Sequence, residues 1–244
     1  MIVSQPARRF EFTLDDAAAD VALDDYLLQT TEDDDAPPIL RLWELSRPAV
    51  IVGRSNRVEQ NVNVTACRAD GVPIIRRSSG GGTVLLGPGS LVYSLILRVD
   101  SGSRLVDIDS TTRLIMNRIR DALQSLLPGV SCEGVSDLAI NSLKVSGNSQ
   151  RWLRRTVLHH GTFLYQFDLP LIERYLGTPE RVPEYRVNRS HREFLRNIPL
   201  SREALVGALV ETWDARHSMP VPDLEAVHRA ARERYRDDDW NFRR

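Results

Sequence analysis

Residues 76–90 read RRSSGGGTVLLGPGS, with glycines at positions 80, 81, 82, 87 and 89. Three common kinds of glycine-rich segment do not fit this stretch. A phosphate-binding P-loop needs a Gly-Lys-Ser/Thr step, and none follows Gly82 or Gly89. The dinucleotide-binding fingerprint needs a strand-to-helix turn, whereas this segment runs from one strand pattern to another. A flexible linker is excluded because apolar strands flank the segment closely on both sides.

What remains is a tight strand–loop–strand element whose glycine backbone can approach a ligand closely and offer N–H groups to it. Arg76 and Arg77 stand at the entrance of this loop and can hold an anion through paired N–H donors. An ordinary surface salt bridge is the competing interpretation of such an arginine pair. The glycine triplet directly behind the pair favours a binding site.

The first half of the chain alternates between strand and helix patterns. Apolar residues at helical spacing predict two longer helices, over residues 15–30 and 110–127. Strands are predicted over four segments, residues 39–45, 49–54, 72–77 and 91–99. Because only Ser-Arg-Pro separates the first two strands, we expect them to form a hairpin.

The second half opens with two short strand patterns around an Asn-Ser turn, over residues 135–150. A long strand pattern follows over 156–169, and helical patterns cover 201–217 and 223–239. There is no internal repeat and no obvious linker. The sequence therefore predicts a single α/β domain over residues 1–244 with a helical end over about 200–240, and no separate accessory domain.

The composition of the chain is that of an ordinary globular protein. It has 42% hydrophobic and 27% charged residues and a formal net charge of -1, so no global basic field recruits nucleic acid. No run of about 18 apolar residues predicts a transmembrane helix, and the N-terminus lacks the apolar core of a secretory signal. Two cysteines, Cys67 and Cys132, predict reduced thiols rather than a disulfide framework. These features indicate a cytoplasmic protein without nucleic-acid or membrane partners.

A lysine marks the second segment of interest, KVSGNSQR at residues 144–151. Lys144 stands just after a turn, on a strand that is otherwise predicted to be buried. Its functional interpretation is a point charge beside a polarised carbonyl or phosphate, and its competing interpretation is a solvated edge-strand lysine. Asp137, across the predicted hairpin, is expected to fix Lys144, to hold a metal ion, or simply to begin a strand.

Tandem histidines in LHHGTFLY, residues 158–165, raise the question of a metal site. Adjacent residues of a strand point to opposite faces, so His159 and His160 cannot readily share one ion. No carboxylate or cysteine lies nearby at ligand spacing. We therefore predict no metal site here, one histidine packed inward, and room beside Gly161 for a close neighbour.

Taken in order, RRSSGGGTV, DLAINSLKVSGNSQR and LHHGTFLY resemble the lipoate–protein ligase A branch of the biotin/lipoate ligase and octanoyltransferase superfamily. The upstream stretches RPAVIVGRSN and VPIIRR also fall in the family's order, and the resemblance covers roughly residues 40–170. It implies a biotin/lipoate ligase-like catalytic domain of the α+β kind. A mixed, largely antiparallel sheet would be packed by helices, with a pocket between the glycine loop and the lysine hairpin.

The resemblance also implies a reaction. Such ligases combine lipoate or octanoate with ATP, and with Mg²⁺ accompanying the nucleotide, to form an acyl-adenylate and pyrophosphate. A lysine of an apo lipoyl domain then attacks the activated carbonyl and forms an amide. The implied acceptor is the lipoyl domain of a 2-oxoacid dehydrogenase complex or a glycine-cleavage H-type protein.

Carried over by matching position, the resemblance makes Lys144 the catalytic residue, which holds the carbonyl and α-phosphate oxygens. Arg76 and Arg77 would contact the phosphate or carboxylate side of the adenylate. The other residues implied to bind substrate or adenylate are Ser79, Gly80, Gly81, Gly82, Thr83, Asp137, Gly147, His160, Gly161 and Thr162. An acyl tail needs an apolar slot, and we expect its walls to come from Val84, Leu85, Leu91 and Leu95.

Two departures from the family pattern leave alternatives open. Many lipoate ligases carry a His-Asp step where this chain has Leu86 and Gly87. The sequence after the helices at 201–236 also leaves little room for the small accessory C-terminal domain that some ligases use. A ligase without that domain would need an accessory partner protein, or would not perform adenylation.

The principal alternative is an ATP-independent octanoyl or lipoyl transferase with Cys132 as its nucleophile. A lysine beside this cysteine would lower the pKa of the thiol and favour the thiolate. An unreactive cysteine is the competing interpretation. A non-catalytic relative that only binds acyl chains is a further alternative, although such binding needs neither Lys144 nor the arginine pair.

Overall fold

The computed structural model describes residues 5–34, 36–99, 107–178 and 183–243; the remaining residues of the predicted domain lie outside this description. Its strands are β1 (Arg8–Glu11), β2 (Ile39–Trp43), β3 (Ala49–Val52), β4 (Ile74–Arg76), β5 (Val84–Leu86), β6 (Ser90–Arg98), β7 (Val130–Glu133), β8 (Asp137–Ile140), β9 (Leu143–Trp152), β10 (Thr156–Leu164) and β11 (His217–Ser218). Its helices are α1 (Ala17–Asp33), α2 (Val58–Asn61), α3 (Val64–Ala69), α4 (Ile108–Gln124), α5 (Pro170–Tyr175), η1 (Glu184–Arg186), α6 (His191–Phe194), α7 (Arg202–Thr212), α8 (Leu224–Ala230), η2 (Ala231–Tyr235) and α9 (Asp238–Asn241).

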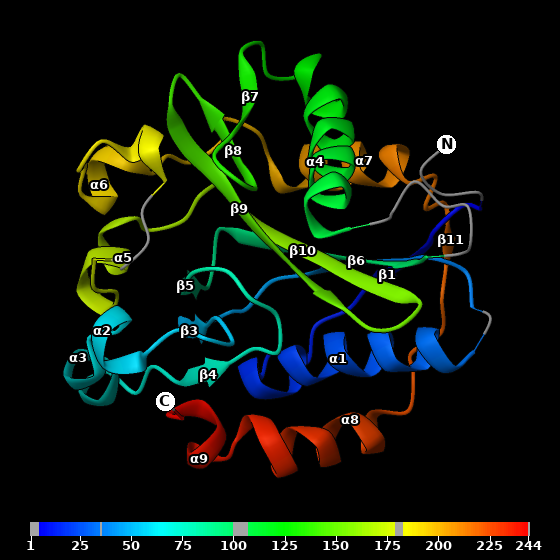
Figure 1. Cartoon of the computed structure of the whole chain (residues 1–244), viewed down its shortest axis with the longest axis horizontal. Helices are drawn as coiled ribbons and strands as arrows, with labels where there is room; N and C mark the ends of the chain where they lie inside the picture. Colours follow the sequence, from blue (N-terminus) through cyan, green and yellow to red (C-terminus); the bar gives the residue numbers. More distant parts are fainter. Residues whose placement is uncertain (1–4, 35, 100–106, 179–182, 244) are drawn as a thin grey trace.

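The strands form two sheets of unequal size (Figure 1). The large sheet has the order β11-β1-β2-β6-β10-β9-β8-β7, and it is antiparallel except where β1 pairs in parallel with β2 and β11. The small sheet has the order β4-β3-β5, with β3 parallel to β4 and antiparallel to β5. The predicted mixed, largely antiparallel sheet with packed helices is confirmed.

The predicted hairpin of residues 39–45 and 49–54 is wrong. β2 belongs to the large sheet, where it pairs with β1 and β6, whereas β3 is the central strand of the small sheet. The short connection between them therefore carries the chain from one sheet to the other. The partners of both strands come from distant parts of the sequence, and a local pattern does not reveal such pairing.

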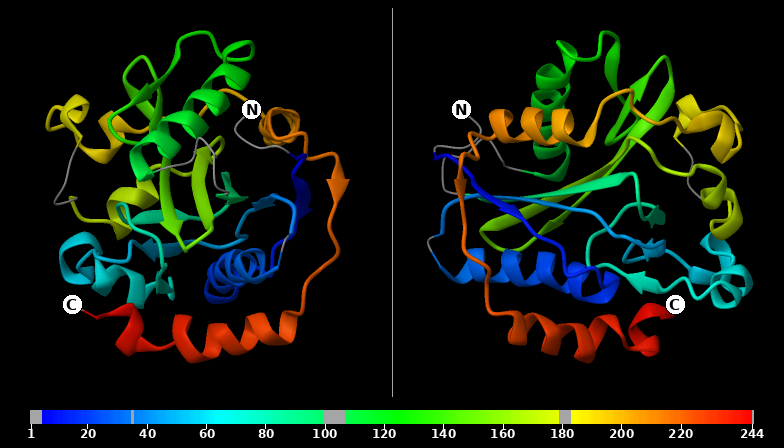
Figure 2. Two further views of the ribbon diagram at one scale, coloured as in Figure 1. Left: turned by 45° about the vertical axis from the view of Figure 1, so that its right-hand side comes forward. Right: turned by 180° about the vertical axis from the view of Figure 1, so that it is seen from behind.

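Helices cover both faces of the large sheet (Figure 2). On one face α4 and α7 enclose a core with the strands, and on the other α1 lies against β6 and β10 while α8 packs outside it. Strand β6 divides its side chains between these cores: Leu91 and Leu95 face α4 and α7, and Val92 and Ile96 face α1. None of the helices in the described residues is long and apolar enough to cross a membrane.

Helix α1 begins as its acidic first turn predicts and buries two further carboxylates. Asp16 caps the helix by accepting hydrogen bonds from the N–H groups of Ala18 and Ala19. Asp20 and Asp24 point into the protein and both pair with Arg41 of β2, whose side chain is fully buried. This ion triad fixes α1 against the large sheet, and one carboxylate of the triad, Asp24, reaches the cavity described next.

Candidate active site

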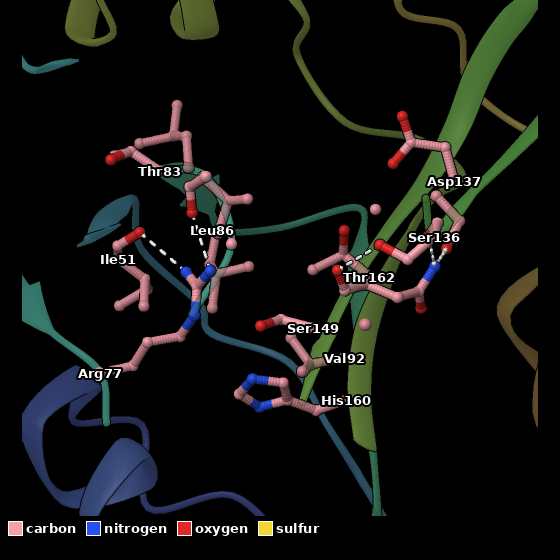
Figure 3. Close-up of a pocket in the computed structure, with 18 of the residues that line it drawn as sticks. Ile51, Arg77, Thr83, Leu86, Val92, Ser136, Asp137, Ser149, His160 and Thr162 are labelled. Atoms are coloured by element: carbon pink, nitrogen blue, oxygen red, sulfur yellow. Dashed lines mark hydrogen bonds between the residues drawn. The ribbon is translucent and has the colours of Figure 1, made fainter. Parts of the chain in front are cut away.

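A cavity of about 440 Å³ lies between the small sheet with its glycine loop, the strands β9 and β10, and helix α1. This volume is in the range of pockets that hold small ligands. In Figure 3, Arg77 extends from one wall, and Ser149, His160 and Thr162 lie on the opposite wall. The cavity thus occupies the place predicted for a pocket, between the glycine loop and the lysine hairpin.

Arg77 is a buried cation at one end of the cavity, with no carboxylate at ion-pair distance among the described residues. Its guanidinium donates to the carbonyl oxygens of Gly80 (2.6 Å), Gly82 (2.8 Å) and Ile51 (3.3 Å), and to Ser79 Oγ (2.9 Å). Burial lowers the pKa of Arg77 to about 10, so it stays charged at neutral pH. A buried charge without a counter-ion favours an anionic ligand.

Arg76 does not line the cavity, so the expectation that both arginines contact the ligand is wrong. Its side chain is 1% exposed and donates to carbonyl oxygens of two separate segments, residues 53–56 and 240–243. Adjacent residues at a strand end point in opposite directions, so only one member of the pair can face the ligand. Arg76 fastens the C-terminal helix α9 to the small sheet instead.

A chain of polar groups connects Arg77 to His160 and Asp24. Ser79 Oγ accepts a hydrogen bond from Arg77 Nε and lies 2.7 Å from His160 Nε2, while His160 Nδ1 lies 3.5 Å from Asp24 Oδ2. Burial favours the neutral acid of Asp24, yet Arg41 and His160 hold the pKa of this carboxyl below its usual value. Ser79 itself is 1% exposed and does not line the cavity, so it positions Arg77 rather than touching a ligand.

The glycine triplet has a different role at each position. Gly81 has φ of +78°, which only glycine adopts readily, and the carbonyl of Gly81 would lie 2.1 Å from a Cβ at Gly53. Gly81 and Gly82 line the cavity, whereas Gly80 does not; its carbonyl instead accepts from Arg77 and, at 2.8 Å, from Ser149 Oγ. Thr83 lines the cavity as well, and its Oγ1 is buried without a partner among the described residues.

Lys144 lines the cavity beside the turn that joins β8 to β9. Its Nζ lies 2.8 Å from Asp137 Oδ1, and Asp137 Oδ2 accepts a hydrogen bond of 2.8 Å from the hydroxyl of Tyr185. Burial and the charge of Asp137 raise the pKa of Tyr185, so the hydroxyl keeps its proton. A Cβ at Gly147 would come within 2.9 Å of Lys144 Nζ, so this glycine leaves the lysine its space.

Lys144 is also the only lysine of the chain. The sequence contains 32 lysine and arginine residues, and all the others are arginines. A lysine therefore stands at the cavity in a protein that uses arginine at every other basic position. A compact ammonium differs from a planar guanidinium in size, in hydrogen-bond geometry and in the number of donors it presents.

Gly161 gives room to the amide of Asn148, the close neighbour that the sequence did not identify. A Cβ at Gly161 would lie 1.6 Å from Asn148 Oδ1. That oxygen accepts a hydrogen bond of 2.6 Å from Tyr93, while Asn148 Nδ2 donates to the carbonyl of Ser136 at 2.7 Å. Thr162, next on the strand, faces the cavity together with His160 and Gly161.

We expect Gly161→Ala to destabilise the protein by about 1–3 kcal/mol, because the new methyl group displaces Asn148 and leaves the buried Tyr93 hydroxyl unpaired. Thermal unfolding of the variant measures this loss. Gly207→Ala is the matched control, since a Cβ at Gly207 in α7 meets nothing within 4 Å. An equal Tm for the two variants would contradict the conclusion that Gly161 leaves room for the side chain of Asn148.

Cys132 lies outside the cavity, contrary to its predicted place beside the lysine. It stands in β7 rather than in a loop, and its thiol points to Asn117 of α4 with an Sγ–Oδ1 distance of 3.7 Å. Burial raises the pKa of the Cys132 thiol, the reverse of the shift expected for a nucleophile. The expectation that Lys144 activates this cysteine is therefore wrong in this structure.

The tandem histidines separate as the strand pattern predicts. His159 is fully buried on the α4 side of the sheet, and burial lowers its pKa to about 3, so the ring is neutral. His160 faces the cavity. Within the described ranges, no three His, Cys, Asp or Glu side chains form a group that could hold a metal ion.

Several residues of the cavity wall differ from the expected ones. Val84 and Leu85 line it, but Leu91 and Leu95 belong to the core on the other face of β6. Their places are taken by apolar side chains that include Ile51, Val92 and Leu158. Three charged residues that line the cavity from distant elements were not identified from the sequence, namely Asp24, Asp25 and Arg186. A buried acid on the apolar face of helix 15–30 was the available signal for the first.

Comparison with known proteins identifies the family. Residues 16–206 match the model of the lipoyl protein ligase A/B catalytic domain. Lipoate–protein ligase 1 of Staphylococcus aureus is 26% identical over 94% of this chain and 71% of its own length. Octanoyltransferase LipM of Halalkalibacterium halodurans is 25% identical over 94% of this chain and 96% of its own.

Among solved structures, a bipartite lipoate protein ligase of Thermoplasma acidophilum, studied with its E2 lipoyl domain, has the same fold. The TM-score is 0.82, with 22% identity over 98% of this chain and 96% of that one. The matched family model spans the cavity, the glycine loop and the lysine hairpin. The resemblance read from the sequence is confirmed, and this chain belongs to the lipoyl protein ligase A/B catalytic domain family.

Proposed function

We propose that this protein is a lipoate–protein ligase that activates lipoate or octanoate with ATP and transfers the acyl group to a lysine of a lipoyl domain. The observation that carries the proposal is the placement of two cations, Arg77 and Lys144, at a mainly apolar cavity. Apolar walls suit a medium-chain acyl tail, and fixed positive charge suits a carboxylate and a phosphate.

In the first step a carboxylate oxygen of the acid attacks the α-phosphorus of ATP. The bond from this phosphorus to the bridging oxygen breaks, and pyrophosphate leaves with the electron pair. Arg77, rigidly held by the loop carbonyls, would fix the carboxylate or the α-phosphate and keep water from competing for it. Lys144 would stabilise the negative charge that builds on the phosphate oxygens.

In the second step the amine of the acceptor lysine attacks the acyl carbonyl, an amide forms, and AMP leaves. The Nζ of Lys144 would stabilise the charge on the carbonyl oxygen. Asp137 and Tyr185 would act as positioning residues, because Asp137 pairs with Lys144 and is itself held by the hydroxyl of Tyr185. The solved ligase studied with an E2 lipoyl domain supports a lipoyl domain as the acceptor.

Mg²⁺ would enter with the phosphates of the nucleotide, where it offsets their charge. The donor set of the described cavity fits that arrangement better than a resident ion, because Asp137 and Asp25 are already engaged by cations and hydroxyls. We propose further that residues 1–244 act as one catalytic unit in the cytoplasm, aided by an accessory partner protein for full adenylation. The bipartite relative supports the accessory partner.

A second candidate is direct transfer of an octanoyl group from a carrier protein without ATP. The match to LipM over nearly the whole of both chains favours it. Cys132 is an unsuitable nucleophile for this reaction, since its thiol faces α4 and its pKa is raised. A direct transferase would therefore need another group of the cavity to accept the acyl chain, or a direct attack by the acceptor lysine.

An acyl-transfer assay with an apo lipoyl domain, read by intact mass, separates the two candidates. One reaction supplies free octanoate or lipoate with ATP and Mg²⁺, and the other supplies octanoyl carrier protein without ATP. We expect modification in the first reaction only. Modification in the second reaction alone would replace the proposed ligase by a transferase, and no modification in either would favour an acyl-binding protein.

We expect Cys132→Ser to keep the wild-type rate in whichever reaction the protein catalyses. The substitution removes a half-buried thiol that lies outside the cavity. Initial rates with the apo lipoyl domain measure the effect, and circular dichroism checks the fold. Loss of carrier-dependent transfer in the folded variant would restore Cys132 as the nucleophile.

A further inference from the structure

A second cation cluster lies between the cavity and a neighbouring hollow of about 460 Å³. The cavity and the hollow share Leu176, Arg186 and His191 in their walls. Arg186 belongs to η1, directly after Tyr185, the residue that holds Asp137 beside Lys144. The cluster therefore adjoins the proposed reaction centre but is formed by a different part of the chain.

Arg186 is 4% exposed, yet no carboxylate lies at ion-pair distance from it among the described residues. Its Nε donates to the carbonyl of Arg189 at 2.8 Å, and Arg189 Nε donates back to the carbonyl of Arg186 at 2.9 Å. Both guanidinium groups also lie against the ring of Phe194, at 5.1 and 5.2 Å from its centroid. The geometry of this pair is thus fixed by backbone and ring contacts.

The terminal nitrogens of Arg186 have no hydrogen-bond partner within the described part of the chain and are not sealed from the cavity. Two carboxylates, Glu173 and Glu193, also line the hollow, but each accepts a hydrogen bond from a backbone N–H group instead. Two neighbouring like charges with free donors are costly to hold together unless an anion joins them. The two arginines thus present cationic donors that suit an anionic ligand.

We propose that Arg186, assisted by Arg189, binds the β- and γ-phosphates of ATP and then the pyrophosphate that leaves. The inference rests on the proposed adenylation, because only that reaction releases pyrophosphate. A planar guanidinium with free terminal N–H groups can grip two phosphate oxygens at once. In this arrangement Lys144 and Arg77 bind the carboxylate and the α-phosphate, which become the acyl-adenylate. Arg186 binds the two phosphates that leave as pyrophosphate.

Separate rate measurements of adenylation and of acyl transfer, made with the whole protein, test whether Arg186 acts only on the pyrophosphate side. Arg186→Gln should raise the KM for ATP and the inhibition constant of pyrophosphate by about tenfold to a hundredfold, as expected for losing a charged hydrogen-bond pair. Transfer from synthetic octanoyl-adenylate to the apo lipoyl domain should keep its wild-type rate. Arg186→Lys should bind pyrophosphate more tightly than Arg186→Gln but less tightly than the wild type, since lysine keeps the positive charge and lacks the paired N–H donors of the guanidinium.

Arg192→Gln is the matched control, because it removes the same charge from an exposed side chain of the adjoining helix α6. It should leave both half-reactions unchanged. Equal slowing of both half-reactions by Arg186→Gln in a folded protein would overturn the proposal. A raised KM for the acceptor domain alone would also overturn it and would assign Arg186 to acceptor docking.

Calorimetric titration with pyrophosphate separates this inference from the proposed function. Wild-type protein should bind pyrophosphate at least about tenfold more tightly than Arg186→Gln. If the wild type forms no adenylate with either acid, the proposed function fails, and the titration still decides whether Arg186 holds a diphosphate. Equal binding by the two proteins would refute the site.

Discussion

Lys144→Ala is expected to slow acyl transfer to the apo lipoyl domain by about 10²–10³-fold, the usual effect of removing one preorganised donor from a developing oxyanion. Both half-reactions should be affected, because the same ammonium would serve the α-phosphate in the first and the carbonyl in the second. Single-turnover rates measured with octanoate and ATP, and separately with synthetic octanoyl-adenylate, give the two effects.

Lys144→Arg provides the matched control for charge. A guanidinium is wider than an ammonium, and the space beside Gly147 is fitted to a lysine. We therefore expect Lys144→Arg to bind substrates but to recover little of the rate. Full acyl transfer by Lys144→Ala would remove Lys144 from the mechanism and leave its ion pair with Asp137 as a structural contact.

Arg41→Met is expected to lower the free energy of unfolding by about 3–5 kcal/mol, because it leaves the carboxylates of Asp20 and Asp24 buried without their cation. For a chain of this length such a loss corresponds to a fall in Tm on the order of 10 °C. Denaturant titration of the wild type and the variant measures the difference directly.

Arg216→Met is the comparison for Arg41→Met, because Arg216 forms an exposed ion pair with Asp214. This variant should lose less than about 1 kcal/mol. Addition of Asp20→Asn and Asp24→Asn to Arg41→Met should recover part of the lost stability by removing the unpaired charges. A similar loss in the two single variants would mean that the buried triad contributes little to the fold.

The glycine loop was predictable from the sequence because local chemistry determines it. The rejection of P-loop and dinucleotide patterns depended only on which residue types follow each glycine. The left-handed backbone of Gly81 and its close approach to Gly53 then require the absence of a side chain. The strand period likewise separated the two histidines correctly, with His159 buried and His160 at the cavity.

The two-residue period of a strand also applies to two expectations that were wrong, the arginine pair at the ligand and Leu91 in the cavity wall. Arg76 and Arg77 are adjacent, so they point to different sides, and alternation along β6 places Val92 rather than Leu91 at the cavity. The sequence does not say which of the two sides holds the ligand. That choice follows from the packing of the small sheet against the large one, which depends on pairing between distant strands.

Other parts of the site could not be predicted because they come from elements without a motif. Asp24 lies on a helix near the N-terminus and meets His160 across 136 positions of sequence. Arg186 lies in the short helix η1, and from the sequence alone its arginine-rich surroundings resemble a solvated surface. The burial of both residues, and the absence of a carboxylate partner of Arg186 among the described residues, are visible only in the folded structure.

The single lysine has a consequence for the chemical durability of the protein. An acyl-adenylate, the intermediate of the proposed reaction, acylates free amines. Apart from the α-amino group this sequence contains one amine, that of Lys144, which pairs with Asp137. The 31 arginines keep their charge and do not compete as nucleophiles at neutral pH. If the proposed reaction takes place, a protein whose basic residues are otherwise arginines would therefore resist acylation by any adenylate that leaves the cavity.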